Sequence, residues 1–306
     1  MKRIMVLGST GMLGHKVFEY FSNLEGYEVF GSYRNELVAP DKNSFVFDAE
    51  CPDWSSIPKC DYILNCIGVI KPFMKNNTVG AIKINSMFPW HLAEWCENNN
   101  TRLIHITTDC VFSGNDGLYT EESLHDCLDD YGKSKSLGEP TNCMVIRTSI
   151  IGEEIHKNAS LVAWAKSQKG KTVNGFTNHY WNGVTTLEYA KVCHQIIDSE
   201  LYSDGLYHVY SPEAVNKLEL LKFISNRFEL ELDIKSFETE NVCDRTLCTN
   251  KDLVKNLDIA AKSYDKAEPF VGNIKKFTTF AKGNISNPLV KALFKTSYGK
   301  AALVGG

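Results

Sequence analysis

Short apolar runs alternate with longer stretches of helical periodicity through the first half of the chain. Near-continuous apolar runs, typical of strands buried on both faces, occur at residues 3–8, 27–34, 44–50, 60–68, 102–112 and 143–152. Apolar positions at helical spacing predict helices over residues 14–24 and 84–100 and a further helix from residue 131. Strands alternating with helices are typical of a parallel sheet covered on both sides, so we expect an α/β fold with a doubly wound, Rossmann-type parallel sheet.

The pattern becomes less regular after about residue 151. Helices are predicted over 160–170, 185–199 and 216–229 and a strand over 205–211, whereas the polar stretch 174–183 is interpreted as a loop. We therefore predict a first domain over residues 1–150. A smaller C-terminal region over 151–306 is expected to be partly interleaved with it.

Composition narrows the class of protein. A net charge of −4 over 306 residues argues against nucleic-acid binding. The apolar run at 4–8 is too short for a signal peptide and no stretch is long enough to span a membrane, so we expect a cytoplasmic protein. Ten scattered cysteines without CxxC or zinc-finger spacing favour free thiols over disulfides or a metal site.

The basic, mildly amphipathic segment 287–306 leaves two interpretations open. It could lie on a membrane surface or a partner. We favour the other interpretation, a C-terminal helix that frays or docks.

A glycine-rich segment, GSTGMLG, joins the first predicted strand to the first predicted helix. Gly8, Gly11 and Gly14 have GxxGxxG spacing. Such a turn lets backbone N–H groups approach a pyrophosphate at a helix N-terminus, although any tight strand-to-helix turn also favours glycine. Because the segment follows the first strand directly, we favour phosphate binding over a plain turn.

The ends of the next strands suggest which dinucleotide would bind. The second strand ends in Ser32, Tyr33 and Arg34 and lacks the acidic residue usual in NAD-binding proteins. The guanidinium of Arg34 suits a ribose 2′-phosphate, which favours NADP. Asp48, after the third strand, either caps a turn or accepts the adenine amino group, and Gly68 would let the backbone pass close to a flat cofactor.

Candidate catalytic residues follow the fifth strand. Tyr131 and Lys135 have the YxxxK spacing that puts both side chains on one helix face. A lysine close to a tyrosine lowers the phenol pKa toward neutrality and makes it a usable acid or base. Thr107 and Thr108 add hydroxyl groups at the end of that strand, the edge where α/β proteins bind ligands.

Taken together, GSTGMLG, TTDCVFSG, YGKSK and VIRTSIIG resemble the extended short-chain dehydrogenase/reductases. Within them the chain is most similar to the dTDP-4-dehydrorhamnose reductase branch of nucleotide-sugar 4-ketoreductases. The resemblance covers about the first 150 residues and continues more thinly through residues 205–224 and 243–250.

The resemblance implies catalytic roles. Tyr131 would protonate the carbonyl oxygen, Lys135 would bind the nicotinamide ribose and tune Tyr131, and Thr108 would hydrogen-bond the substrate oxygen. The first domain would bind NADP and the second region mainly the substrate. The implied activity is NADP-dependent reduction of a 4-keto nucleotide-diphosphate sugar, in surface polysaccharide or deoxysugar biosynthesis. The oligomeric state stays open, and a homodimer is one option.

The same resemblance implies binding roles for further positions. Arg245 would lie near the sugar nucleotide. The implied cofactor residues are Gly8, Gly11, Met12, Leu13 and Gly14 at the pyrophosphate, Asp48 at the adenine and Asn85 in support.

Three departures from the branch concern the substrate site. Cys110 replaces the usual tyrosine after Thr-Asp, residues 65–72 lack the branch's usual pattern of small residues and threonine, and Thr246 replaces a proline after Arg245. A dehydratase would need a glutamate directly after Asp109, which Cys110 does not supply. The missing glutamate weakens the dehydratase interpretation. The alternatives to the reductase are an epimerase or dehydratase on the same scaffold and a non-catalytic NADP-binding regulatory subunit.

Residues 179–182 form an aromatic and polar group whose role the sequence leaves open. His179, Tyr180, Trp181 and Asn182 suit a platform for a sugar or base, and Trp181 is our candidate substrate-binding residue. The alternative is a loop anchored by one buried tryptophan. His179 could act as a second proton donor, but we favour a structural role for it.

Overall fold

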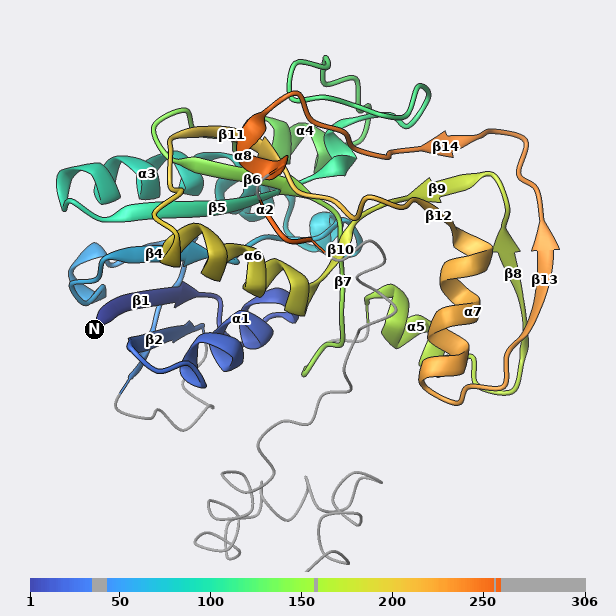
Figure 1. Ribbon diagram of the computed structural model, residues 1–306, viewed down its shortest axis with the longest axis horizontal. Coiled ribbons are helices and arrows are strands. Elements are labelled where there is room, and N and C mark those ends of the chain that lie inside the picture. The colour runs from blue at the N-terminus through green and yellow to red at the C-terminus, as the bar shows by residue number, and fades with distance from the viewer. Residues whose placement is uncertain (35–42, 157–158, 256, 260–306) are drawn as a thin grey trace, which may run out of the picture. The chain divides into compact units, whose positions relative to one another are not determined.

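A seven-stranded parallel sheet forms the centre of the protein (Figure 1). This computed structural model describes residues 1–34, 43–156, 159–255 and 257–259, all of which belong to one compact unit. The strand order is β11-β6-β5-β4-β1-β2-β3, the doubly wound arrangement of the Rossmann type, so the predicted fold class is confirmed. The strands are β1 (Lys2–Leu7), β2 (Tyr27–Tyr33), β3 (Ser44–Val46), β4 (Tyr62–Asn65), β5 (Arg102–Thr108), β6 (Met144–Thr148) and β11 (Gly205–His208).

Both faces of the sheet are buried, which explains the near-continuous apolar runs. Along β1, Ile4 and Val6 enter one core cluster, and Met5 and Leu7 enter the other. The first cluster is completed by helices α1 (Met12–Ser22) and α6 (Thr186–Asp198), and the second by α3 (Phe88–Asn98).

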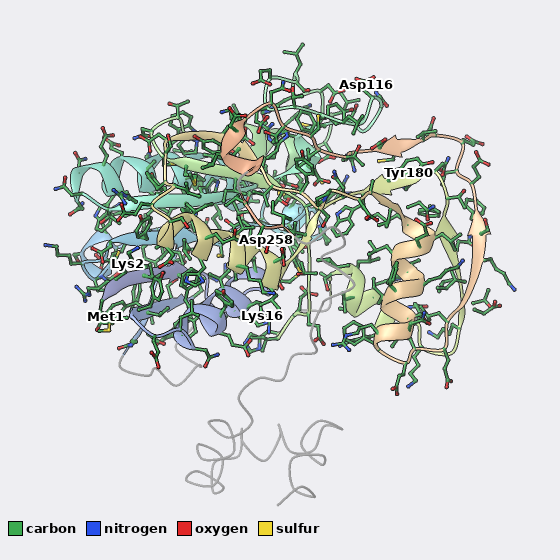
Figure 2. The ribbon with its side chains drawn as sticks, viewed as in Figure 1. Met1, Lys2, Lys16, Asp116, Tyr180 and Asp258 are labelled. Atoms are coloured by element: carbon green, nitrogen blue, oxygen red, sulfur yellow. The ribbon has the colours of Figure 1, made fainter. Side chains whose placement is uncertain are left out.

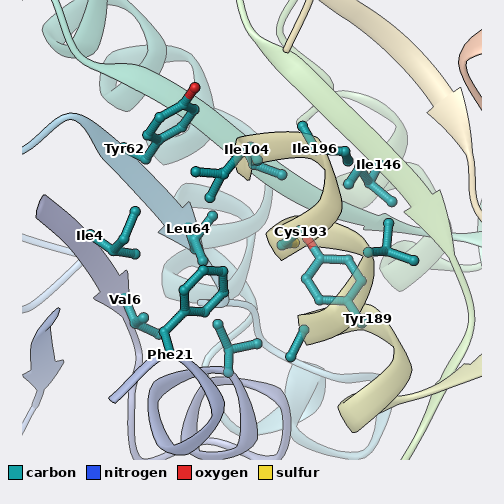
Figure 3. Packing of buried hydrophobic residues seen from close by; sticks show 14 of the residues in the cluster. Ile4, Val6, Phe21, Tyr62, Leu64, Ile104, Ile146, Tyr189, Cys193 and Ile196 are labelled. Carbon is teal, nitrogen blue, oxygen red and sulfur yellow. The ribbon is translucent and has the colours of Figure 1, made fainter. Parts of the chain in front are cut away.

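Helix α6 comes from the second half of the chain and packs directly on the sheet. Figure 3 shows Tyr189 and Cys193 of α6 facing Leu64, Ile104 and Ile146 of the central strands. All five side chains are at most 1% exposed. Strand β11 also belongs to the central sheet, where it pairs with β6. Residues beyond position 150 therefore complete the core that the first 150 residues begin.

The stretch 174–183, which we predicted to be a loop, is largely strand. It contains parts of β8 (Thr172–Phe176) and β9 (His179–Trp181) and is followed by β10 (Val184–Thr185). These strands pair with short strands that lie mostly far away in the sequence. Polar side chains occupy the exposed faces of β8 and β9, so no continuous apolar run marks the two strands in the sequence. The partners are β7 (Ile150–Ile151), β12 (Val215–Asn216), β13 (Asp233–Phe237) and β14 (Cys243–Asp244).

Helices pack beside these small sheets and along the central one. Helices α5 (Leu161–Ser167) and α7 (Lys217–Arg227) share a third core cluster with β9 and β12. The predicted helix over 84–100 begins in a π-helical segment (Lys83–Met87) and continues as α3, and α2 (Thr78–Ile82) directly precedes it. Helix α4 (Asp130–Ser136) carries the YxxxK pair, and α8 (Asp252–Lys255) follows β14. None of the described helices is long and apolar enough to cross a membrane.

The long connection between β5 and α4 is held by a segment from the end of the described chain. Tyr119 N donates to Thr246 O at 2.9 Å, and Cys248 N donates to Tyr119 O at 2.9 Å. Figure 2 shows Asp116 at the outer edge of this connection and Tyr180 on the outer surface at β9. The basic segment 287–306, for which we predicted a helix, lies outside the described residues.

Candidate active site

A cleft of about 800 Å³ opens at the carboxyl ends of the central strands. Parallel strands bring their carboxyl ends to one edge, so segments far apart in sequence meet there. Segments after β1, β2, β4 and β5 line the cleft together with α4 and the start of α7. Among the residues predicted from sequence, the lining includes Gly8, Gly11, Met12, Leu13, Arg34, Asp48, Gly68, Thr108, Tyr131, Lys135 and Trp181.

The glycine segment forms a tight turn into α1. Gly8 has a φ of +78°, which an L-residue rarely adopts. A side chain on Gly14 would collide with the carbonyl oxygen of Gly8, so Gly14 lets the helix approach the turn without itself lining the cleft. Ser32 fixes the turn against β2, because its hydroxyl accepts from Gly8 N at 2.9 Å. No side chain within the described residues caps the start of α1 at Gly11, which leaves this helix N-terminus open to an anion.

Arg34 and Asp48 lie in the same cleft as the glycine turn. Arg34 is exposed directly after the end of β2. Asp48 is half-buried, and its Oδ1 accepts from Glu50 N at 2.9 Å, which leaves its second carboxylate oxygen for another donor. The sequence placed Asp48 either at a turn or at the cofactor, and its position in the structure is compatible with both.

Thr108 and Tyr131 meet at the opposite part of the cleft. Thr108 ends β5, and its Oγ1 donates to Asp109 Oδ1 at 3.1 Å and accepts from Cys110 N at 3.2 Å. The Tyr131 hydroxyl lies close enough to the Thr108 side chain for the two to interact. Helix α4 is held at its start by Asp129, which accepts from Gly132 N at 2.9 Å.

The pKa of Tyr131 differs from our prediction. We expected Lys135 to lower it, but burial raises the pKa of Tyr131 above its ordinary value, an effect that the neighbouring Thr108 side chain opposes. The ammonium of Lys135 donates to Ile106 O at 3.1 Å, and burial lowers its pKa to about 8. At neutral pH the phenol is therefore protonated and suited to donate a proton.

The cleft fits a dinucleotide cofactor on two observations. The glycine turn and the uncapped start of α1 form a backbone cradle that larger residues would fill. In addition, the Thr107 hydroxyl lines the cleft, is buried and has no hydrogen-bond partner among the described residues. A buried hydroxyl without a partner is costly, and a polar group of a ligand would supply one.

Asn85 and Arg245 are predicted ligand residues that do not line the cleft. Asn85 is fully buried in the π-helical segment; its amide exchanges hydrogen bonds with the Val69 backbone at 2.8 and 2.9 Å and donates to Ser134 Oγ at 3.1 Å. It thereby positions the cleft wall and α4. The Arg245 guanidinium donates to the carbonyl oxygens of Phe112 and Ser113, at 2.9 and 3.1 Å. Its donors therefore hold the connection after β5.

Of the four residues 179–182, only Trp181 lines the cleft. Asn182 is buried and exchanges two hydrogen bonds with the Leu247 backbone, at 2.8 and 2.9 Å. His179 Nε2 lies 2.9 Å from Thr239 Oγ1. These contacts give Asn182 and His179 structural partners outside the cleft, whereas Trp181 presents an aromatic side chain within it.

Lys217 lines the cleft and was missed in the sequence. It is the first residue of α7, and its Nζ lies 5.7 Å from the centroid of the Trp181 ring. The pattern Asn216-x-x-Glu219 marks the start of a helix in the sequence. Nothing in that pattern indicates that the helix start faces the cleft.

Arg147, from the VIRTSIIG segment, lies in a buried cluster outside the cleft lining. Its guanidinium donates to Glu139 at 2.7 and 3.2 Å, to His208 Nε2 at 2.8 Å and to His125 Nε2 at 2.6 Å. Burial and Arg147 lower the pKa of His208 to about 4, so this ring is neutral and accepts. Glu139 directly follows the turn after α4, and the cluster thus ties that helix to β6 and β11.

Comparison with known proteins identifies relatives over most of the chain. The family model described as the RmlD substrate binding domain matches residues 1–247. A "probable low-salt glycan biosynthesis reductase Agl14" from Haloferax volcanii is 26% identical over 229 residues, 69% of this chain and 75% of that protein. "Methionine adenosyltransferase 2 subunit beta" of Danio rerio is 26% identical over 254 residues, 75% of each chain.

Solved structures share the fold. A hypothetical dTDP-4-dehydrorhamnose reductase from Sulfolobus tokodaii has a TM-score of 0.69 at 24% identity, covering 84% of this chain and 95% of its own. The dTDP-4-dehydrorhamnose reductase from Bacillus anthracis, in complex with NADP, has a TM-score of 0.69 at 18% identity, covering 87% and 98%.

Proposed function

Because the chain belongs to the RmlD substrate binding domain family, we propose that it is an NADP-dependent reductase of a 4-keto nucleotide-diphosphate sugar. The observation that carries this proposal is that one cleft holds both the candidate catalytic residues and the glycine turn. Tyr131, Thr108 and Lys135 lie in the same cleft as the glycine turn at Gly8 and Gly11. That combination supports reduction of a carbonyl group by a bound dinucleotide.

The protein's own residues supply the proton and hold the reacting oxygen. NADPH, when bound, supplies the hydride for the carbonyl carbon. Tyr131 donates its phenolic proton to the carbonyl oxygen, because its raised pKa keeps it protonated until charge develops on that oxygen. Thr108 lies next to Tyr131, and its hydroxyl, which donates to Asp109 in this structure, would turn to donate to the same oxygen. Lys135 holds the nicotinamide ribose and places positive charge near the phenol.

The end of β2 supports NADP as the dinucleotide. Arg34 lies exposed at the cleft, where its guanidinium would bind the ribose 2′-phosphate. Asp48 would accept the adenine amino group, and Met12 and Leu13 would offer backbone N–H groups to the pyrophosphate. The Bacillus anthracis reductase contains NADP, and another structural relative, MoeE5, is described with UDP-glucose and NAD.

One relative also supports a biosynthetic role for the proposed reaction. Agl14 is named as a glycan biosynthesis reductase, so we assign the chain to surface polysaccharide or deoxysugar biosynthesis in the cytoplasm. In this assignment residues 1–150 bind mainly the cofactor and residues after 151 mainly the substrate, with Trp181 against the sugar. A homodimer remains an option.

Epimerase or dehydratase chemistry is less well supported. A dehydratase needs an acid and base pair beside the threonine, and Asp109 is followed by Cys110. Burial raises the pKa of Cys110 to about 12, so its thiol is no base at neutral pH.

A non-catalytic regulatory subunit is the second candidate, because one relative is named as the beta subunit of methionine adenosyltransferase 2. Such a subunit would keep the fold and bind the dinucleotide without turnover. The two candidates agree on cofactor binding and differ only in the need for the Tyr131 proton.

Tyr131→Phe separates the two candidates. With a panel of 4-keto sugar nucleotides, NADPH oxidation by this variant should fall about 10²- to 10⁴-fold, because the proton donor is lost. Fluorescence titration should show unchanged NADPH affinity. No turnover by the wild-type protein on any member of the panel, together with tight NADPH binding, would instead support the regulatory subunit.

A further inference from the structure

Three lysine and arginine side chains line the cleft in the part of the chain that the structure describes: Arg34, Lys135 and Lys217. Arg34 lies at the end of β2, beside the glycine turn. Lys135 is bonded to Ile106 O at 3.1 Å in the catalytic part. Lys217 belongs to neither group, and the proposed function leaves its positive charge without a role.

The surroundings of Lys217 place it close to the reacting part of the cleft. Its ammonium lies over the Trp181 ring, 5.7 Å from the centroid. Burial lowers the pKa of Lys217, and Asp109, the residue after Thr108, is the strongest of the charged groups that oppose this shift. No carboxylate of the described residues lies within salt-bridge distance of Lys217, so its hydrogen-bonding capacity remains available to a ligand.

Regular elements fix the position of Lys217. Asn216 and Glu219 form a capping box at the start of α7, with the Asn216 side chain accepting from Glu219 N at 2.9 Å. Val215, in β12, pairs with Trp181 in β9. Lys217 and Trp181 are therefore held side by side by helix and strand, which favours a precise contact with a ligand.

Arg245, which the resemblance placed near the sugar nucleotide, makes its hydrogen bonds outside the cleft lining. Its guanidinium donates to Phe112 O and Ser113 O, at 2.9 and 3.1 Å, and it does not line the cleft. Lys217, in contrast, lines the cleft beside Trp181.

We propose that Lys217 binds the diphosphate of the sugar nucleotide, while Trp181 covers the adjoining sugar. The inference rests on the proposed function. In a 4-keto sugar nucleotide the phosphate is attached at C1, across the ring from the reacting C4. With C4 at Thr108, the diphosphate would lie across the sugar ring from Thr108, and Lys217, which lines the same cleft and interacts electrostatically with Asp109, would supply the cation for it. A lysine serves there as a point charge for an anion that leaves the apolar cleft toward water.

The test compares nucleoside diphosphates with nucleosides in calorimetric titrations of the full chain. The probes are dTDP, UDP, thymidine and uridine, and the variants are Lys217→Met and Lys217→Arg. Lys222→Met is the matched control, because Lys222 is exposed on the same helix. NADPH titrations of all four proteins serve as the measure of an intact fold.

The expected result is selective loss of the diphosphate contribution. The wild-type protein should bind at least one diphosphate more tightly than its nucleoside. Lys217→Met should weaken that affinity about 10- to 100-fold and leave nucleoside and NADPH affinities unchanged, as expected for loss of a charge-assisted contact. Lys217→Arg, which keeps the charge, should restore most of the affinity, and Lys222→Met should have no effect.

Three outcomes overturn the inference, and they differ in what else they overturn. If the wild-type protein binds a diphosphate and Lys217→Met binds it equally well, the inference fails and the proposed function stands. If the wild-type protein binds NADPH but neither diphosphate, the inference fails together with the proposed substrate class. If Lys217→Met loses NADPH binding as well, the Lys217→Arg titration decides. If Lys217→Arg then binds NADPH normally but no longer binds the diphosphate, the positive charge alone does not suffice and the inference fails.

Discussion

The buried cluster around Arg147 and the cleft around Lys135 and Lys217 both hold charged side chains largely away from water. The two regions differ in how fully the protein's own groups supply hydrogen-bond partners for those charges. Arg147 is fully buried, and the structure supplies partners for its guanidinium on Glu139, His208 and His125. In the cleft, Lys135 donates to one backbone carbonyl, that of Ile106, and Lys217 has no carboxylate in salt-bridge range among the described residues.

The difference indicates what each region does. A buried charge whose hydrogen bonds are satisfied within the chain maintains the fold, although it rarely adds net stability over an apolar core. A buried charge with few partners is held at a cost, and such groups concentrate at binding and catalytic sites. The comparison therefore assigns the Arg147 cluster to the framework and the cleft charges to the ligand.

Arg147→Met should give the largest effect on stability. It leaves Glu139 with an uncompensated, nearly buried carboxylate and removes the donors to two histidines, so we expect a loss of about 3–5 kcal/mol in the free energy of unfolding. Urea denaturation at pH 7 measures it. The control is Arg3→Met, because Arg3 pairs with Glu28 at the partly exposed surface and should cost less than about 1 kcal/mol. Equal losses in the two variants would contradict the comparison.

Lys135→Met should change the free energy of unfolding in the opposite direction and stabilise the protein. Burial lowers the pKa of Lys135 from 10.5 to about 8, so below pH 8 the folded protein holds a charge that the unfolded chain holds more easily. The variant should be more stable at pH 7 by about 3 kcal/mol and lose NADPH turnover.

The pH dependence supplies the control for that change. Between about pH 8 and 10.5 the unfolded wild-type chain binds more protons than the folded one at Lys135, so wild-type stability rises there and the advantage of the variant shrinks. Denaturation curves of both proteins at pH 7, 9 and 10.5 measure the gap. A gap that stays constant across this range would show that Lys135 carries no such cost.

Arg34→Ala should have the smallest effect on stability, because Arg34 is exposed. Its effect should be confined to binding, with NADPH affinity falling about 10-fold toward that for NADH. Parallel fluorescence titrations with the two dinucleotides measure the preference. Unchanged selectivity would remove the 2′-phosphate role from Arg34 and leave the glycine turn and the Thr107 hydroxyl as support for a dinucleotide.

The central sheet was predictable because each of its strands must be apolar on both faces. Ile4 and Met5 alternate between the two core clusters, and this burial leaves a continuous apolar run in the sequence. The position of the cleft follows from the same sheet, since its carboxyl edge brings Gly8, Thr108 and Arg34 together. The catalytic and binding roles of these residues remain predictions.

What the sequence did not predict depends on distant partners. Strand β8 is defined by pairing with β13, about sixty residues later, and a polar pattern gives no sign of it. Arg245 was expected near the substrate. Its guanidinium donates instead to backbone carbonyl groups of a loop more than 130 residues away in the sequence. The raised pKa of Tyr131 likewise reflects burial that a helical spacing of Tyr and Lys does not contain.

The return of the chain to the central sheet bears on folding during synthesis. Strand β6 ends at Thr148, and its outer neighbour β11 ends at His208, sixty residues later. At the usual pace of translation the ribosome takes about 3–12 s to make that stretch. Until it emerges, Ile104 and Ile146 lack the cover of α6, and the edge of β6 lacks its partner. A nascent chain of this length exposes the kind of surface that chaperones bind.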